Sequence, residues 1–227
     1  MTTTAVTYDR QELILPSADA EQASCHVFGV GTVGSNGAVE LARLGIGKLH
    51  LYDYDVIEAH NLPSQRYFRA QVGVKKVVAC TAQIKAVAND DVIIHAIDEK
   101  ITEPMIVDGP LICAVDSMEG RRHIFTNIAK NSFSCGLFID VRMSGNTLQI
   151  YSLDPQNKEL CEYYEATLFD DKDADPAPCG GRTVSYTGAI SGGLIATYVR
   201  KHLVGGTTPF FWSFDLDAID ASPAARA

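Results

Sequence analysis

The chain has 227 residues, of which 46% are hydrophobic and 21% are charged, a length and composition that fit one α/β domain with a sizeable core. With 19 basic and 28 acidic residues the net charge is −9, which argues against nucleic acid as the main partner, because phosphate binding favours a basic face. No apolar run approaches the ~20 residues that cross a bilayer, so we expect no membrane partner. The start, MTTT, lacks the features of a signal peptide, and six cysteines without a pairing motif suggest reduced thiols; we therefore expect a cytoplasmic protein.

Hydrophobic periodicity predicts that strands and helices alternate along the chain. Short β-branched runs predict strands at about residues 25–30, 48–53, 91–97, 110–115, 136–142 and 146–152. Longer amphipathic runs predict helices at about 33–44, 70–88, 118–131 and 184–203. Because such alternation forms right-handed βαβ crossovers, we expect an α/β fold with a doubly wound, Rossmann-like, mostly parallel sheet. The Ser-Gly-Asn at residues 144–146 predicts an added antiparallel hairpin between the last two strands.

Two segments are expected to lack regular structure. Residues 170–178 hold four aspartates and two prolines and predict a mobile loop before the last helix. The chain after about residue 209 opens with an aromatic cluster and ends in alanines, and we expect it to be partly disordered. Neither an internal repeat nor a linker interrupts the sequence, so we expect a single domain over residues 1–227.

A glycine-rich turn at residues 28–34 (FGVGTVG) is the first signal of a nucleotide site. Gly29 permits a tight turn, Gly31 lets the backbone approach a phosphate, and Gly34 lets the following helix pack on its strand. The N-terminus of that helix supplies unpaired N–H groups for an anion. Asp53 stands nineteen residues beyond Gly34 at the end of an apolar run, where a carboxylate accepts hydrogen bonds from ribose hydroxyls. These residues alone fit NAD and ATP equally well.

Charged residues elsewhere in the chain favour ATP. Lys76 opens an expected helix, Arg10 precedes the first strand, and Asp116 ends an apolar run ahead of Ser117, a good helix N-cap. Hydride transfer has little use for such groups around the phosphates. Splitting a nucleoside triphosphate needs cations to neutralise oxyanions and a carboxylate to hold Mg²⁺. Each residue taken singly could be an ordinary surface group, but their joint position at strand ends of a doubly wound sheet favours a ligand site.

Together these motifs resemble the E1-like adenylating enzymes, the ThiF/MoeB superfamily that includes ubiquitin-activating enzymes and bacterial proteins that adenylate sulfur carriers. The resemblance covers roughly residues 7 to 203 and is nearest to stand-alone members from phages, plasmids and bacterial ubiquitin-like operons. It implies that Arg10 reaches the nucleotide of a neighbouring subunit, and hence a homodimer or a pseudo-symmetric heterodimer. It also implies that Asn61 and Gln65 orient the phosphates, that Lys76 contacts them and that Asp116 binds Mg²⁺.

The chain departs from that superfamily in three ways. Position 64 is serine where the family signature has an arginine, and Arg66 is the nearest residue that could replace it. The two Cys-x-x-Cys pairs that hold zinc in many relatives are absent, so we expect no structural zinc. The chain ends soon after the helix near residue 203, so we expect neither a catalytic-cysteine domain nor a ubiquitin-fold domain.

The resemblance implies ATP- and Mg²⁺-dependent adenylation of the C-terminal carboxylate of a small ubiquitin-like or sulfur-carrier protein. Adenylation joins a carboxylate to the α-phosphate and expels pyrophosphate, and it needs positioning and charge neutralisation rather than a general base. Lys76 and Arg10 would then stabilise the phosphates while Asp116 holds the metal. Asp55 has two possible roles of equal weight, as a ligand of the metal ion or as a cap of its loop.

Cys179 is the candidate for a second step, because it follows the acidic loop where relatives carry a cysteine that can become acylated or persulfurated. The glycines at 180–181 would leave it accessible, and Arg182 could lower the pKa of the thiol. A free structural cysteine is the alternative, with equal weight. Four further cysteines lie in apolar runs and are expected in the core, namely Cys25, Cys80, Cys113 and Cys135. Cys161 and the six histidines show no metal-binding spacing and are assigned to no site.

Three other functions stay open. One is adenylation of a small molecule or peptide. Another is a catalytically weakened scaffold subunit, which Ser64 favours and which the three glycines, Lys76 and Asp116 disfavour. The last is an NAD-dependent enzyme.

Overall fold

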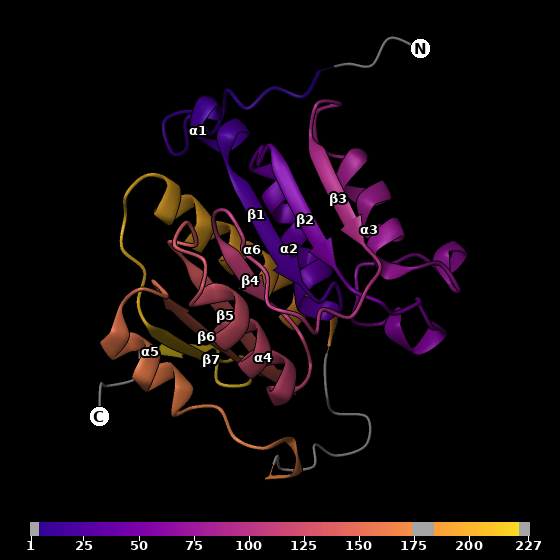
Figure 1. Cartoon of the computed structure of the whole chain (residues 1–227). Coiled ribbons are helices and arrows are strands. Elements are labelled where there is room, and N and C mark those ends of the chain that lie inside the picture. Colours follow the sequence, from indigo (N-terminus) through magenta and orange to yellow (C-terminus); the bar gives the residue numbers. More distant parts are fainter. Residues whose placement is uncertain (1–4, 174–183, 223–227) are drawn as a thin grey trace.

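The structure is a computed structural model that describes residues 5–173 and 184–222. Its centre is one eight-stranded sheet with the strand order β3-β2-β1-β4-β5-β6-β7-β8 (Figure 1). The five strands at one side are parallel: β3 (Ile93–Ile97), β2 (Lys48–Tyr52), β1 (Ser24–Phe28), β4 (Leu111–Cys113) and β5 (Phe138–Ser144). The strand order reverses between β1 and β4, and open α/β sheets bind ligands at such a switch point. The predicted mostly parallel, Rossmann-like fold is confirmed.

The remaining strands are antiparallel. β6 (Thr147–Leu153) pairs with β5 through the predicted hairpin, in a register that places Phe138 opposite Leu153. Two strands that the sequence did not predict follow residue 209, because β7 (Phe211–Asp215) pairs with β6 and β8 (Asp220–Ser222) pairs with β7. The rest of the tail, residues 223–227, lies outside the described residues. Packing explains the difference. The Phe211 ring lies 4.6 Å from that of Tyr151 on β6, so the aromatic cluster gives this edge of the sheet an apolar surface.

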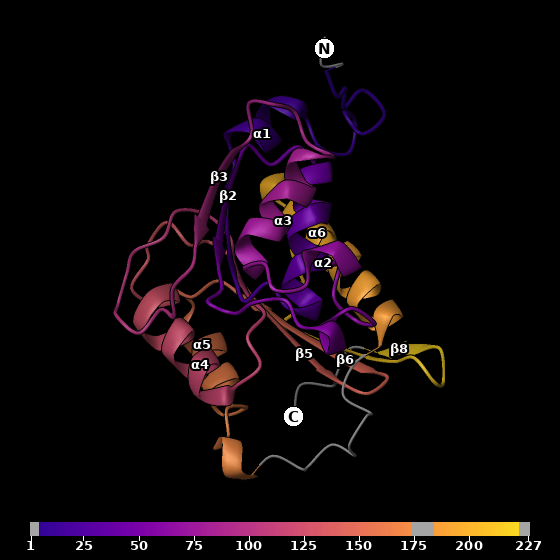
Figure 2. The same ribbon diagram turned by 90° about the vertical axis from the view of Figure 1, so that its right-hand side faces the viewer.

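Helices cover both faces of the sheet (Figure 2). On one face lie α2 (Thr32–Arg43), α3 (Lys76–Lys85) and α6 (Ser185–Leu203), and on the other lie α4 (Met118–Ile124), which continues as a π-helix over Phe125–Ala129, and α5 (Lys158–Glu165). α2 and α6 pack closely because glycines face the contact. A Cβ on Gly37 would lie 2.8 Å from the Ile195 side chain, and one on Gly192 would lie 2.9 Å from the backbone of Asn36.

The predicted elements differ from the observed ones mainly at their ends. The helix expected over 70–88 begins only at Lys76, because Gly73 adopts a left-handed φ of +86° after a 3₁₀ turn at Arg69–Gln71. The short α1 (Ser17–Gln22) and α5 are additional to the prediction. Of the acidic loop expected at 170–178, Asp170 has no regular structure, Asp171–Asp173 forms a 3₁₀ turn, and residues 174–178 lie outside the described residues.

Two apolar clusters form the core, one on each face of the sheet. Leu49, Leu51 and Ile195 belong to the cluster under α2, α3 and α6, whereas Phe125 and Tyr164 belong to the cluster under α4 and α5. The four cysteines predicted to be core residues are all buried, and Cys161 is buried as well. Among the described residues no helix is both long and apolar enough to cross a membrane.

Candidate active site

The glycine turn lies between β1 and α2, at the switch point of the sheet. Gly29 has a φ of +84°, and a Cβ there would lie 2.7 Å from the Ala114 carbonyl oxygen beyond β4. A Cβ on Gly34 would lie 1.8 Å from the carbonyl oxygen of Gly29, so helix and strand touch at this glycine. Gly31 is the N-cap of α2, and its Cβ position meets only the side-chain nitrogen of Gln65, at 3.8 Å. Two glycines are therefore used for packing, and the third leaves free space above the N-terminus of α2.

The carboxylate of Asp53 holds this turn in place. It follows β2, and its Oδ2 accepts a hydrogen bond of 2.8 Å from the Val30 N–H, while its Oδ1 accepts one of 2.9 Å from the Asp55 N–H. The hydroxyl of Tyr67 donates to the Val30 carbonyl at 2.6 Å, and burial raises the pKa of that hydroxyl, so it keeps its proton. Each oxygen of Asp53 retains capacity for a further donor such as a ribose hydroxyl.

Lys76 forms an ion pair with Asp55, with 2.6 Å between Nζ and Oδ2. The Lys76 side chain is only 9% exposed, whereas that of Asp55 is 49% exposed. The backbone supports the pair, because the Lys76 N–H donates to the Asp55 carbonyl at 3.0 Å. Lys76 is thus a buried cation whose partner carboxylate faces solvent. Neither reading of Asp55 from the sequence included this pairing.

The segment between β2 and α3 brings two amides toward the turn. Asn61 Oδ1 accepts a hydrogen bond of 2.9 Å from the Glu58 N–H and so stabilises a 3₁₀ turn. Gln65 lies beside the Gly31 turn, and its Oε1 is buried without a hydrogen-bond partner. Buried amide oxygens are nearly always paired, so an unpaired one beside an open helix N-terminus is a polar position available to a ligand.

Arg66 points away from the turn. Its guanidinium lies 3.1 Å from Glu40 Oε1, nine residues after Gly31 on α2, or about 13 Å along the helix axis. In this structure it therefore does not take the place of the arginine missing at position 64. The Ser64 hydroxyl instead accepts a hydrogen bond of 3.3 Å from Thr32.

Asp116 is brought to the turn by the pairing of β1 with β4. The Ala114 N–H donates to the Phe28 carbonyl at 2.8 Å, which places the chain leading to Asp116 against Gly29. Asp116 itself is exposed. Ser117 caps α4 as predicted, because its hydroxyl accepts from the Gly120 N–H at 3.1 Å.

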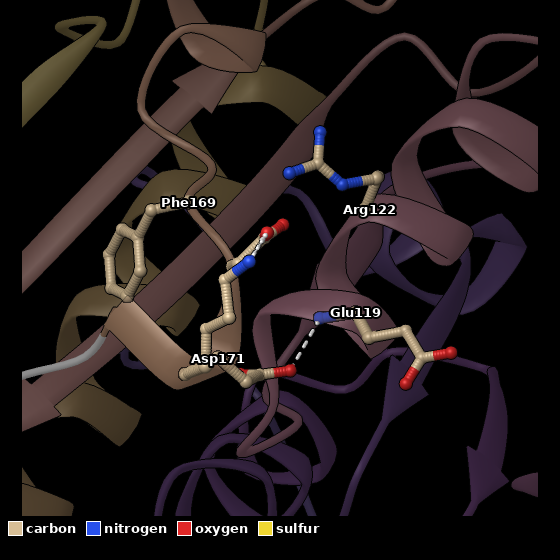
Figure 3. Close-up of a pocket in the computed structure, with 6 residues that line it drawn as sticks. Glu119, Arg122, Phe169 and Asp171 are labelled. Atoms are coloured by element: carbon tan, nitrogen blue, oxygen red, sulfur yellow. Dashed lines mark hydrogen bonds and ion pairs between the residues drawn. The ribbon is translucent and has the colours of Figure 1, made fainter.

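A second carboxylate at the start of α4 was not predicted. Asp171 accepts hydrogen bonds from the N–H groups of Met118, at 2.6 Å, and Glu119, at 3.1 Å. Figure 3 shows Asp171 pointing to this helix terminus, at the edge of a shallow pocket also lined by Arg122 and Phe169. No spacing rule signals a cap that is 53 residues away in the sequence.

A buried charge cluster lies behind Asp116. Asp140 on β5 is fully buried and accepts hydrogen bonds from Arg121, Arg142 and Tyr164, the last two at 2.7 and 3.0 Å. Arg121 also donates to the carbonyl oxygen of Val115, the residue before Asp116. The cluster thereby fixes the end of β4 from which Asp116 projects.

Two predicted site residues are not in this group. Arg10 is exposed, and the N-terminal segment docks at the far end of the sheet, where Gln11 donates to the Leu44 carbonyl at 2.7 Å beyond the last turn of α2 (Figure 1). A twelve-residue α2, about 18 Å long, separates that position from the glycine turn of the same chain. Cys179 lies outside the described residues.

The chain is similar to known proteins in sequence and in fold. The model of the ThiF family matches residues 9–225. The chain belongs to the ThiF family. Ubiquitin-like modifier-activating enzyme 5 from Bombyx mori is 45% identical over 76 residues, which is 34% of this chain and 19% of that protein. The enzyme of the same name from Drosophila willistoni is 34% identical over 128 residues, 49% of this chain and 31% of that protein.

This ThiF-family chain also resembles solved structures along most of its length. A crystal structure of Escherichia coli MccB with ATP superposes with a TM-score of 0.71 at 18% identity, covering 92% of this chain and 65% of MccB. PaaA superposes with a TM-score of 0.69 at 20% identity, covering 98% of this chain and 84% of PaaA. These likenesses show the fold. The chain covers less than a third of the length of the two activating enzymes named above.

Proposed function

We propose that this chain is an ATP- and Mg²⁺-dependent adenylyltransferase that activates the C-terminal carboxylate of a small ubiquitin-like or sulfur-carrier protein. The observation that carries the proposal is the juxtaposition at the switch point of the sheet. The N-terminus of α2 is open at Gly31, with the Gln65 amide beside it, and the Asp53 carboxylate holds the turn. Asp53 also accepts a hydrogen bond from the Asp55 N–H, and the Asp55 carboxylate pairs with the buried cation of Lys76. Membership of the ThiF family and similarity to enzymes named for activating ubiquitin-like modifiers support the carrier protein as substrate.

Each residue has a defined task in this proposal. The N–H groups at the start of α2 bind phosphate oxygens, and Asp53 binds the ribose hydroxyls. Lys76 neutralises charge that the phosphates gain as pyrophosphate leaves, because an anion competes with the half-exposed Asp55 for the ammonium group. Asn61 and Gln65 orient the phosphates. Asp116 holds Mg²⁺, which shields the phosphate oxygens from the incoming carboxylate.

Arg10 fits the proposal only in a dimer. Because it lies at the far end of its own sheet, it can serve a nucleotide site only by reaching that of a second chain. Exposed apolar side chains surround it, with Leu13 103% and Ile14 58% exposed, as expected for a segment that packs on a partner. We therefore propose a homodimer in which each chain supplies Arg10 to the other.

A second candidate is adenylation of another carboxylate, that of a peptide or small molecule. It is considered because this chain shares its fold with MccB and PaaA along 92% and 98% of its length. MccB has been solved in complex with MccA. The two candidates share the nucleotide site and differ in the acyl substrate.

Pyrophosphate exchange tests the proposal. The enzyme is incubated with ATP, Mg²⁺ and labelled pyrophosphate, together with carrier proteins that end in Gly-Gly. We expect exchange that requires a free C-terminal carboxylate and stops when that carboxylate is amidated. Exchange with short peptides but with none of the carriers would favour the second candidate. Absence of exchange and of ATP binding would contradict both.

Neighbouring lysines provide a matched pair of variants. Lys76→Ala should abolish exchange, because the site loses its buried cation. Lys75→Ala should keep most of it, since the Lys75 ammonium is 41% exposed and contacts Asp98 and the Tyr54 carbonyl, both at 2.9 Å, but neither the Asp53 nor the Asp55 carboxylate. Equal loss in both variants would mean that charge near this helix start, rather than the buried lysine, supports the reaction.

A further inference from the structure

Three histidines form a stack across the parallel strands. His26 on β1, His50 on β2 and His95 on β3 lie opposite one another in the strand register. Their rings are parallel to within 11° and 19°, with centroids 4.1 Å apart for the first pair and 4.6 Å for the second. They occupy the face of the sheet opposite α2 and α3, because neighbouring strand residues such as Val27 and Leu51 pack into the core on the other face.

Asp108 completes a cluster with two of these rings. It precedes β4, and its Oδ1 lies 2.9 Å from His26 Nε2. The Nε2 of His50 is buried and has no hydrogen-bond partner. One ligand atom from each of His26, His50 and Asp108 falls within 4.8 Å of the other two. A buried ring nitrogen with an unused position beside a carboxylate is the feature that a histidine packed only for stability would not need.

We propose that His26, His50 and Asp108 form a binding site for a divalent transition-metal ion, with Zn²⁺ as the ion to test first. Two imidazoles and a carboxylate are a donor set that Zn²⁺ accepts, with water as a fourth ligand. The Cys-x-x-Cys pairs whose absence predicted no structural zinc have no part in this site.

The surroundings suit such an ion. The Tyr52 hydroxyl lies 3.0 Å from His26 Nδ1, which leaves Nε2 facing Asp108 and fixes the orientation of the ring. Metal-binding histidines are typically held by such a second hydrogen bond. The Asp108 side chain is 60% exposed, so solvent reaches the cluster; the carboxylate also accepts a hydrogen bond of 3.2 Å from the Ser24 hydroxyl and lies 4.0 Å from the Lys48 ammonium.

Binding requires a small closure. Zn–N and Zn–O bonds of about 2.0–2.2 Å put any two ligand atoms at most about 4.4 Å apart. The cluster, with separations of up to 4.8 Å, must therefore tighten, and the two parallel rings must tilt toward a shared point. In the proposed site Asp108 moves and the partly exposed His50 ring rotates, and the His95 ring, stacked 4.6 Å from His50, shifts with it.

Zinc competition against a chromophoric chelator tests the site in the full-length protein after treatment with EDTA. We expect one Zn²⁺ per wild-type chain, and a loss of affinity of about tenfold or more in His50→Gln and in Asp108→Asn. His95→Gln removes the third ring of the stack and should change the affinity less than twofold. Cys179→Ser and Asp116→Asn should also bind as wild type, which separates this site from the thiol and from the proposed nucleotide site.

A thermal melt gives a second readout. Free Zn²⁺ at about 100 times the wild-type Kd should raise the Tm of the wild type by about 5–10 °C and that of Asp108→Asn by about half as much or less. Asp108 is largely exposed, so this variant stays informative if His50→Gln fails to fold. Wild-type protein that binds no Zn²⁺ at micromolar concentrations would overturn the proposal. Unchanged affinity in both ligand variants would overturn it as well.

Discussion

The glycine turn offers a way to separate folding from nucleotide binding with two single-methyl changes. Gly31→Ala and Gly34→Ala add the same group three residues apart, at positions with opposite surroundings. The Cβ of alanine at 34 would lie 1.8 Å from the Gly29 carbonyl oxygen and 3.2 Å from the Val27 side chain. At 31 the nearest atom is the Gln65 amide nitrogen at 3.8 Å.

These distances set the expected magnitudes. At position 34 both contacting groups are backbone or core, so α2 must move by more than ~1 Å from β1, and such overpacking destabilises by about 1–3 kcal/mol or more. For a domain of this size that corresponds to a loss of about 2–12 °C in Tm. At position 31 no protein atom is displaced, and the free energy of unfolding should change by less than about 1 kcal/mol.

The effect of Gly31→Ala on nucleotide binding should be large although its effect on stability is small. The methyl group at 31 fills the space above the α2 N-terminus that a phosphate would occupy, so Gly31→Ala should weaken MgATP binding at least about tenfold while the protein melts like the wild type. Calorimetric titration with MgATP and differential scanning calorimetry measure the two effects. If Gly31→Ala binds MgATP as tightly as the wild type, the phosphates do not lie on this turn. If Gly34→Ala is as stable as the wild type, α2 does not pack against the Gly29 carbonyl and Val27 as closely as the structure shows.

Four further outcomes are expected, two from the structure and two from the proposed function. Asp140→Asn should lower the free energy of unfolding by about 3–5 kcal/mol in urea titrations, because it leaves two buried guanidinium groups without a counter-charge; a change below about 1 kcal/mol would contradict this. Mixing Arg10→Ala with Lys76→Ala should restore partial activity, because a hybrid dimer keeps one intact site, and no restoration in subunits that exchange would argue against sharing. Cys179→Ser should keep pyrophosphate exchange and lose any reducible adduct with the carrier in intact-protein mass spectra; an adduct at full yield would remove the thiol role. Burial, with the neighbouring histidines, lowers the pKa of His50 to about 4. Between about pH 6.5 and pH 4 only the unfolded state takes up the proton, so the free energy of unfolding measured in EDTA should fall as the pH drops through this range. In His50→Gln the free energy of unfolding should depend less steeply on pH.

Local signals explain which parts of the geometry around the glycine turn could be predicted from the sequence. The glycine spacing encodes a turn whose close contacts are made within a few residues, and Asp53 follows directly from the end of a strand. Asp116 was found in the same way, because parallel strands deliver their carboxyl ends to one edge of the sheet. Arg10 could be assigned to the candidate site only through the family resemblance, because within its own chain it lies at the far end of that sheet.

The remaining features depend on contacts that the sequence pattern does not encode. The Asp171 carboxylate reaches the start of α4 across 53 residues, and the pair formed by Lys76 and Asp55 depends on the turn at Gly73 that delays α3. The histidine stack depends on the register of three parallel strands. His26, His50 and His95 lie 24 and 45 residues apart in sequence, a spacing that matches no metal-binding motif.

The most direct test of the central claim is a calorimetric titration of the wild-type protein and Lys76→Ala with ATP in the presence of Mg²⁺, and separately with NAD. In the proposed function the buried lysine and the exposed Asp116 carboxylate serve a triphosphate and its metal ion. Wild-type protein should then bind MgATP and not NAD, and Lys76→Ala should lose MgATP binding while melting like a folded protein. Tight binding of NAD without binding of ATP would contradict the assignment of this site.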